Sequence, residues 1–466
     1  MPPSRLLVVG VVLGAAAFAL AQGMVTLQFE YALGLCFVAA VFVFVFIKTE
    51  AGLYFVLFSM LLSPEFAMGG RLAESRTVVV RLEDLLLLAI ALSWFARTAV
   101  NKELGLVAQT PLNRWITLYT VTTLLATLVG YLTGTVKTAA GFFYVLKYVE
   151  YFVVYYLTIN NLRDRPQAWR LVTTAFLTAA IVSLVGLAQI PGGHRVSAPF
   201  EGEAGEPNTM GGYLLLMMAV AAGLALESPR LRVRTAMIGL LGLMAVPFVF
   251  TLSRASYLGI VPMVATLALL SSRRRLMGGV LLLILVGAPF LVPSLLPPAV
   301  RGRVFETFVP EHGQPTVRLG RLAFDPSTSE RLMAMSGALE GWMRRPILGW
   351  GVTGFRFMDA QYARTLVETG IIGLLVFLGL LQAIVRNAAD SMRRVTHPED
   401  RGLVLGFIAG TVGLLFHAIG SNTFIIVRIM EPFWFFAGVV LALPALQEAR
   451  APAPAPQPAR AFGYSG

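Results

Sequence analysis

The short sequence TLSRAS, from Thr251 to Ser256, places a single arginine among small hydroxyl residues between two long apolar segments. An arginine held there is costly unless it meets an anion or water. The planar fork of Arg254 can bind two phosphate oxygens at once. The alternative is a guanidinium that only reaches the lipid headgroups. The neighbouring hydroxyls of Ser253 and Ser256 favour the anion site.

A second polar segment, from Gly192 to Glu206, precedes another apolar segment and contains His194 and Arg195. Pro207 and Asn208 follow it and predict the start of a helix, with Asn208 as the N-cap. Because helix N-termini attract anions, a phosphate could bind near Asn208. An ordinary solvated loop with a capped helix is the alternative.

Lys147 and Glu150 lie three residues apart in the apolar segment GFFYVLKYVEYFVVYYL and therefore share one helix face. Charges inside a membrane usually pair, so we expect an ion pair that stabilises the surrounding helices. A polar substrate cavity at this position is the alternative.

Membrane-spanning helices must position these residues, because a chain with 57% hydrophobic and 13% charged residues does not form an ordinary soluble domain. Apolar runs of about 17 to 25 residues can each cross a bilayer core as a helix. The sequence predicts about fourteen such spans, at 5–22, 28–47, 51–66, 82–97, 113–134, 140–160, 169–190, 209–226, 235–251, 255–271, 276–292, 364–386, 403–420 and 430–447. The first span is expected to be retained rather than cleaved.

Lysines and arginines gather in every second connection between these spans, as the positive-inside rule requires. The pattern predicts that both termini are cytoplasmic and that the connections with Arg195 and Arg254 face the periplasm of a bacterium. The net charge of +12 then follows mainly from topology. The basic clusters lack interleaved aromatic residues, so a nucleic-acid partner is not expected.

One long polar region, 293–363, interrupts the spans and is predicted to be a large periplasmic loop. Within it, Ser327 to Glu330 predicts a capping box. An amphipathic helix follows at 329–345, with Arg331 on its polar side, and lies on the bilayer or covers a cavity. The fold class is therefore all-α, a polytopic membrane bundle of about 12 to 14 transmembrane helices. Its expected parts are spans 1–11 over 1–292, the loop, spans 12–14 over 364–447, and a disordered cytoplasmic tail at 448–466.

Motifs of metal and cofactor chemistry are missing from the sequence. There is no Gly-rich phosphate loop and no HExxH, the single cysteine is Cys36, and the four histidines are scattered. We therefore expect no metal and no cofactor.

Four stretches together resemble the O-antigen ligase and polymerase superfamily of bacterial inner-membrane enzymes. They are PNTMGGYLLL (207–216), TLSRASYLGI (251–260), RRPILGWGVTGF (344–355) and LVETGIIGLLVF (366–377). RLEDLLL (81–87) and the span with Lys147 and Glu150 are weaker resemblances.

The resemblance implies a donor glycan on a polyprenyl-diphosphate carrier, used without a metal or a nucleotide sugar. Fixed cations and helix termini must then stabilise the leaving diphosphate, and we assign Arg254, Arg195 and Arg331 to this role. The substrate cavity is expected to contain four further side chains: Asn208, Tyr362, Lys147 and Glu150.

The attacking sugar hydroxyl needs a base. Ligases that this chain resembles carry a histidine near the end of the long loop, whereas this chain reads FRFMDAQYARTLVETG there. The difference favours a polymerase. Asp359 is the first candidate for the base, Glu368 is the second, and His312 is a third if its loop folds back.

These observations predict a polymerase of O-antigen or another surface polysaccharide, which transfers a glycan to the nonreducing end of a lipid-linked repeat unit. The expected partners are polyprenyl-diphosphate-linked oligosaccharide, membrane lipids and a chain-length regulator protein. A ligase that uses another acceptor is the nearest alternative. A lipid-linked oligosaccharide flippase would need charges along a path through the whole bundle, and a metal-dependent glycosyltransferase would need an acidic pair where Glu65 and Glu74 stand apart.

Overall fold

The computed structural model describes residues 29–63, 65–73, 76–100, 109–200, 205–287, 302, 316–319, 322–323 and 325–448. Four of the sequence predictions lie outside these residues: the span at 5–22, the tail after Glu448, and the roles considered for His312 and Glu74.

Long helices make up most of the described chain and follow the predicted spans. They are α2 (Phe29–Ile47), α3 (Thr49–Leu62), α4 (Leu82–Val100), α5 (Asn113–Leu132), α6 (Ala140–Asn161), α7 (Arg165–Gln189), α8 (Pro207–Glu227), α9 (Leu231–Phe250), α10 (Arg254–Leu270), α11 (Arg274–Leu282), α14 (Pro326–Arg344), α15 (Gln361–Arg394), α16 (Pro398–His417) and α17 (Val427–Glu448). Eight of the described helices are long and apolar enough to cross a membrane. The predicted helical membrane bundle is therefore confirmed, and α14 lies where the amphipathic helix is expected.

Two short hairpins depart from the all-helical expectation. The span predicted at 51–66 ends at Leu62, because β1 (Glu65–Ala73) follows and pairs antiparallel with β2 (Arg76–Arg81). A second hairpin, β3 (Arg318–Leu319) with β4 (Leu322–Ala323), precedes α14. The span predicted at 276–292 begins as α11 and continues as a π-helical segment, η3 (Leu283–Gly287), beyond which 288–292 are outside the described residues.

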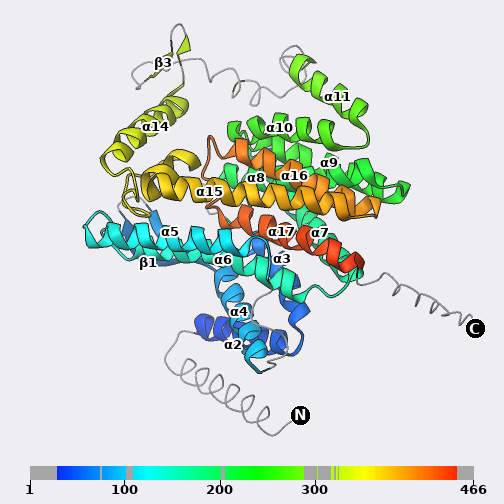
Figure 1. Cartoon of the computed structure of the whole chain (residues 1–466), viewed down its shortest axis with the longest axis horizontal. Helices are drawn as coiled ribbons and strands as arrows, with labels where there is room; N and C mark the ends of the chain where they lie inside the picture. The colour runs from blue at the N-terminus through cyan, green and yellow to red at the C-terminus, as the bar shows by residue number, and fades with distance from the viewer. Residues whose placement is uncertain are drawn as a thin grey trace, which may run out of the picture.

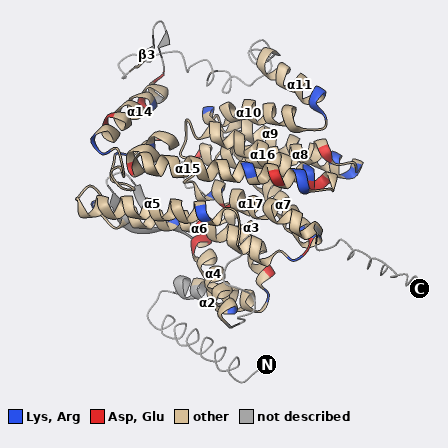
Figure 2. Cartoon of the chain, viewed as in Figure 1, with Lys and Arg blue, Asp and Glu red and all other residues tan. Residues whose placement is uncertain are grey.

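Figure 1 shows most of the long helices side by side. α14 packs against the start of α15 at one end of the bundle, and the C-terminal end of α17 lies at the other end. We call the end of the bundle that carries α14 the loop end. The opposite end, where α8 meets α9 and where α16 begins, is the basic end. Figure 2 shows charged residues gathered there, while the middle of the helices is largely uncharged.

Glycines bring α8 and α16 into close contact at the centre of the bundle. A Cβ atom on Gly223 would lie 2.3 Å from the carbonyl oxygen of Gly402, and one on Gly406 would lie 2.5 Å from the Cα of Val220. Small residues allow such backbone contact, which drives helix association where lipid is as apolar as the side chains. The start of α8 and the end of α16 are thereby held in a defined relation.

The end of the long loop is joined to α15 at a break in that helix. Gly370 has a φ of 68° and a ψ of −170°, which interrupts the helical hydrogen bonds. Four backbone bonds join the loop end to α15 there: Trp350 N–H to Val367 O (2.9 Å), Gly351 N–H to Glu368 O (2.8 Å), Ile371 N–H to Pro346 O (2.9 Å) and Ile372 N–H to Ile347 O (3.4 Å). The sequences RRPILGWGVTGF and LVETGIIGLL therefore form one joint that ties the loop to the bundle.

Candidate functional site

Arg254 begins α10 at the loop end, next to the first turn of α8. Ser253 caps α10, and its Oγ accepts the N–H of Ser256 at 3.3 Å. The same Ser253 hydroxyl donates to Oδ1 of Asn208 at 2.7 Å. The hydroxyls around Arg254 therefore join the N-termini of α8 and α10.

The sequence predicted Asn208 as the N-cap of α8, and this prediction is wrong. The N-cap is Glu206, which makes no side-chain cap bond, and Pro207 occupies the first turn. The Asn208 side chain instead accepts from Ser253, because α10 packs beside α8. The residue keeps its place at a helix N-terminus but is oriented by a neighbouring helix.

Arg254 also holds the N-terminus of α14. Its Nη1 donates to both carboxylate oxygens of Asp325 at 2.9 and 2.8 Å and to the hydroxyl of Thr328 at 3.1 Å. The two charged side chains are 16% and 9% exposed. Three helix N-termini, those of α8, α10 and α14, are thus joined through the adjacent residues Ser253 and Arg254.

The cap of α14 differs from the predicted capping box. Asp325 is the N-cap and accepts the Thr328 N–H at 3.3 Å, while Ser327 lies within the helix. Burial opposes ionisation of Asp325, but hydrogen bonds from Thr328 and Arg254 outweigh it and lower the pKa of the carboxyl below its ordinary value. Asp325 is therefore an anion that the site binds, and sequence reasoning missed it.

Arg195 lies beside the same turn and bonds to its backbone. Its Nε donates to the carbonyl of Thr251 at 3.0 Å and its Nη2 to that of Leu252 at 3.2 Å. These carbonyls follow the last turn of α9, where a cation is favoured by the helix dipole. Leu252 has a φ of 52°, an uncommon conformation for leucine. Arg195 thus stabilises the turn that presents Arg254.

Arg331, in the second turn of α14, lies within electrostatic range of His417. His417 is fully buried at the end of α16, and its Nδ1 is 2.6 Å from the hydroxyl of Thr423. Its Cε1 would lie 3.2 Å from a Cβ on Gly212, one turn after Asn208. Sequence reasoning treated this histidine as one of four scattered ones. The available signal was its place at the loop end of a span.

Asp359 joins this region through the connection between α16 and α17. The Asn422 side-chain amide donates to Oδ1 of Asp359 at 3.1 Å and to the carbonyl of Met358 at 2.7 Å. The next residue, Thr423, is the partner of His417. Asp359 and His417 are therefore held by adjacent residues of one connection.

Tyr362 packs against the same helix end. Its hydroxyl donates to the carbonyl of Leu415 at 2.7 Å, and the backbone N–H of Gln361 donates to the carbonyl of Ala418 at 3.1 Å. The start of α15 is thus bonded to the end of α16, which carries His417.

Glu368, the second candidate for the base, is held in the joint of the loop with α15. Its Oε1 accepts from Nε of Arg364 at 3.2 Å and from the N–H of Thr353 at 3.1 Å. Both charged side chains are less than a tenth exposed. These contacts neutralise Glu368 and tie it to the loop backbone.

Lys147 and Glu150 form the predicted ion pair, with 3.0 Å between Nζ and Oε2. Lys147 also pairs with Asp84 of α4, a partner that the sequence did not predict. These contacts connect Lys147 to α4, whereas Arg254 is bonded to α14 and its neighbour Ser253 to α8. The site residues predicted from the sequence therefore fall into separate groups of contacts.

Comparison with known proteins concerns this same region. Residues 239–378 match a family model described as O-Antigen ligase. The match begins in α9 and ends in α15, so it includes Arg254, Asp325, Arg331 and Asp359. No curated protein matches the chain. The match supports glycan transfer of the ligase and polymerase type and agrees with the resemblance seen in the sequence. From α9 into α15, this membrane protein is therefore similar to the O-antigen ligase family.

Proposed function

We propose that this protein is a polymerase of O-antigen or another surface polysaccharide, acting at the periplasmic face of the bacterial inner membrane. The observation that carries the proposal is that Ser253 and Arg254 join the N-termini of α8, α10 and α14. Each N-terminus carries about half a positive charge from its aligned peptide dipoles. Such a place suits the diphosphate of a lipid-linked donor.

In the proposed reaction an acceptor hydroxyl attacks the anomeric carbon of the donor glycan. The new glycosidic bond forms as the bond from that carbon to the diphosphate oxygen breaks, and the diphosphate leaves on its lipid. Arg254, with Arg331 and Arg195 nearby, stabilises the negative charge that develops on the leaving group. Fixed donors of this kind act without reorganisation and need no metal ion.

Asp359 is the proposed base that takes the proton of the attacking hydroxyl. Its side chain is half-buried and accepts from Asn422, whereas Glu368 is paired with Arg364 and bonded to Thr353. A carboxylate oxygen that already binds a guanidinium and a backbone N–H is less available to contact a substrate hydroxyl. The contacts therefore favour Asp359 over Glu368.

The acceptor decides between a polymerase and a ligase. The family model is described as O-Antigen ligase, which favours the ligase as the second candidate. The proposed acceptor is the nonreducing end of a second lipid-linked repeat unit, and a chain-length regulator protein would be a further partner of such a polymerase.

The test uses purified protein, a lipid-diphosphate-linked repeat unit and EDTA, without nucleotide sugar. A ladder of increasing glycan length is expected, with Asp359→Asn slower by about 10²- to 10⁴-fold, the range of general-base catalysis. Transfer to an added acceptor without a ladder would replace the polymerase with the ligase. A reaction that stops on chelation would refute the metal-independent mechanism, and equal rates for Asp359→Asn and wild type would remove Asp359 as the base.

A further inference from the structure

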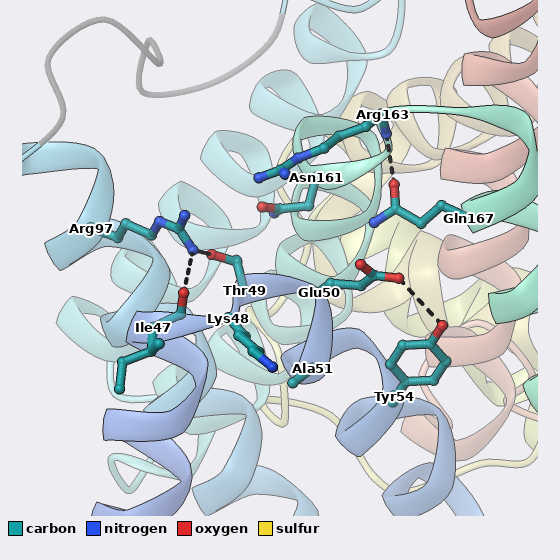
Figure 3. Close-up of a pocket in the computed structure, with 10 residues that line it drawn as sticks. All are labelled: Ile47, Lys48, Thr49, Glu50, Ala51, Tyr54, Arg97, Asn161, Arg163 and Gln167. Atoms are coloured by element: carbon teal, nitrogen blue, oxygen red, sulfur yellow. Dashed lines mark hydrogen bonds between the residues drawn. The ribbon is translucent and has the colours of Figure 1, made fainter.

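The basic end of the bundle holds a cavity of about 350 Å³, away from the site around Arg254. It lies where α2 meets α3 and where α6 meets α7, and the last turn of α4 closes one side (Figure 3). The volume lies within the range of about 300 to 1,000 Å³ that is usual for small-ligand pockets.

Of the described residues, three basic side chains from separate segments line this cavity: Lys48, Arg97 and Arg163. Lys48 precedes α3, Arg97 belongs to the last turn of α4, and Arg163 lies between α6 and α7. Residues so far apart in the chain come together only through helix packing. The cavity therefore concentrates positive charge beyond what a single basic connection supplies.

Among the described residues that line the cavity, Glu50 is the single acidic one, and it is already compensated. Oε1 of Glu50 is 3.0 Å from Nη2 of Arg170, and the Tyr54 hydroxyl donates to it at 3.3 Å. Figure 3 shows Glu50 turned toward Tyr54. The three basic side chains therefore keep most of their charge for a ligand.

Polar groups in the wall favour a ligand that accepts hydrogen bonds. Oε1 of Gln167 accepts the Arg163 N–H at 2.8 Å, which leaves the NH₂ of this buried side chain as the group that can donate to a ligand. Arg97 is half-buried and anchored by donating to Thr49 and to the Ile47 carbonyl. An anchored guanidinium loses less entropy when it binds an anion.

We propose that this cavity binds a phosphate group, carried by an anionic lipid headgroup or by a small soluble phosphate. Cations and N–H donors with a compensated carboxylate match phosphate oxygens and disfavour a cationic ligand. The cavity lies at the ends of spanning helices, where headgroups lie. The positive-inside rule also predicts basic residues at this end of the helices. It does not explain why three of them line one cavity, because other basic residues at helix ends, such as Arg393 and Arg394 of α15, do not line it.

The experiment compares the double variant Lys48→Gln/Arg163→Gln with the matched control Arg393→Gln/Arg394→Gln. Both remove two positive charges from the same end of the full-length protein. Native mass spectrometry in neutral detergent measures retention of phosphatidylglycerol against phosphatidylcholine. Glycerol 3-phosphate and inorganic phosphate are titrated separately by isothermal calorimetry.

We expect the cavity variant to bind the phosphate probe about tenfold or more weakly, since each charge near an anionic surface contributes about a factor of five. The control should stay within about twofold of wild type. Retention of phosphatidylglycerol alone would identify a lipid headgroup as the source, and saturable binding of glycerol 3-phosphate would identify a soluble one. Equal weakening in both variants, or no binding of any probe to wild type, would overturn the proposal. Arg163→Gln alone, which leaves Lys48 in place, serves if the double variant fails to fold.

Discussion

Arg254 has two partners to account for, the proposed diphosphate and the observed Asp325, and substitutions can separate them. Arg254→Ala removes the charge that is proposed to face the substrate, and it also leaves Asp325, only 9% exposed, without this cation. Asp325→Asn breaks the same ion pair but keeps the guanidinium. Asparagine is also a good N-cap, so α14 keeps its cap in this variant.

The two roles predict different magnitudes. Loss of one fixed donor to a developing oxyanion costs about 10²- to 10³-fold in kcat, or about 2.7–4 kcal/mol. Loss of the ion pair costs stability of about 1–3 kcal/mol, because both partners are mostly but not fully buried. We therefore expect Arg254→Ala to slow transfer by about 10²- to 10³-fold. Asp325→Asn should lose a similar amount of stability and less than about tenfold in rate.

The assay follows release of the lipid diphosphate at saturating donor, with the amount of folded protein equalised by size-exclusion chromatography. Thermal unfolding of both variants gives the structural cost. If Asp325→Asn is as slow as Arg254→Ala at equal folded protein, then Arg254 acts by holding α14 rather than by stabilising the leaving group. Normal turnover of Arg254→Ala would remove it from the site altogether.

Three further predictions concern the fold that presents the site. Gly370→Ala should reduce the yield of folded protein, because φ is positive there and a Cβ would lie 2.1 Å from a backbone carbonyl oxygen. Gly242→Ala should not reduce the yield, because a Cβ at that position meets open space. Equal yields from the two variants would contradict the role of Gly370 in joining the loop to α15. Because the pKa of Asp325 is lowered in the folded state, its contribution to stability is present above the unfolded pKa of about 3.9 and is lost as pH falls through the lower folded value. Limited proteolysis should therefore show that α14 loses protection in that acidic range. The Asp325→Asn variant should not show this pH-dependent loss of protection. Lys147→Met should lower the free energy of unfolding by about 3–5 kcal/mol, because it leaves a buried carboxylate uncompensated. The double variant Lys147→Met/Glu150→Gln should recover part of this loss. If the single variant is as stable as wild type in thermal unfolding, the ion pair is not a stabilising contact.

The helical bundle, its long spans and the ion pair of Lys147 with Glu150 could be predicted from the sequence alone. A span needs only a sufficient apolar run, and an ion pair three residues apart on a helix needs only that helix. The helix in the long loop is local in the same sense. Periodicity and residue type carry this information without knowledge of the fold.

Only the tertiary structure decided which groups surround Arg254. The side chain of Asp325 is 71 residues away in the chain, and Asn208 is 45 residues from Ser253. Asp325 caps α14 in place of the capping box predicted at Ser327, and it is held there by the guanidinium of Arg254 from α10. No local pattern reports such a partner.

The position of His417 has the same origin. It meets the first turn of α8 because glycines let α8 and α16 touch along their length. The break at Gly370 likewise has meaning only because the end of the loop supplies the backbone bonds that α15 lacks there. Local sequence determines which helices form and roughly where they end. Contacts between helices decide which of their ends meet, because the free energy of those contacts comes from residues distant in the chain.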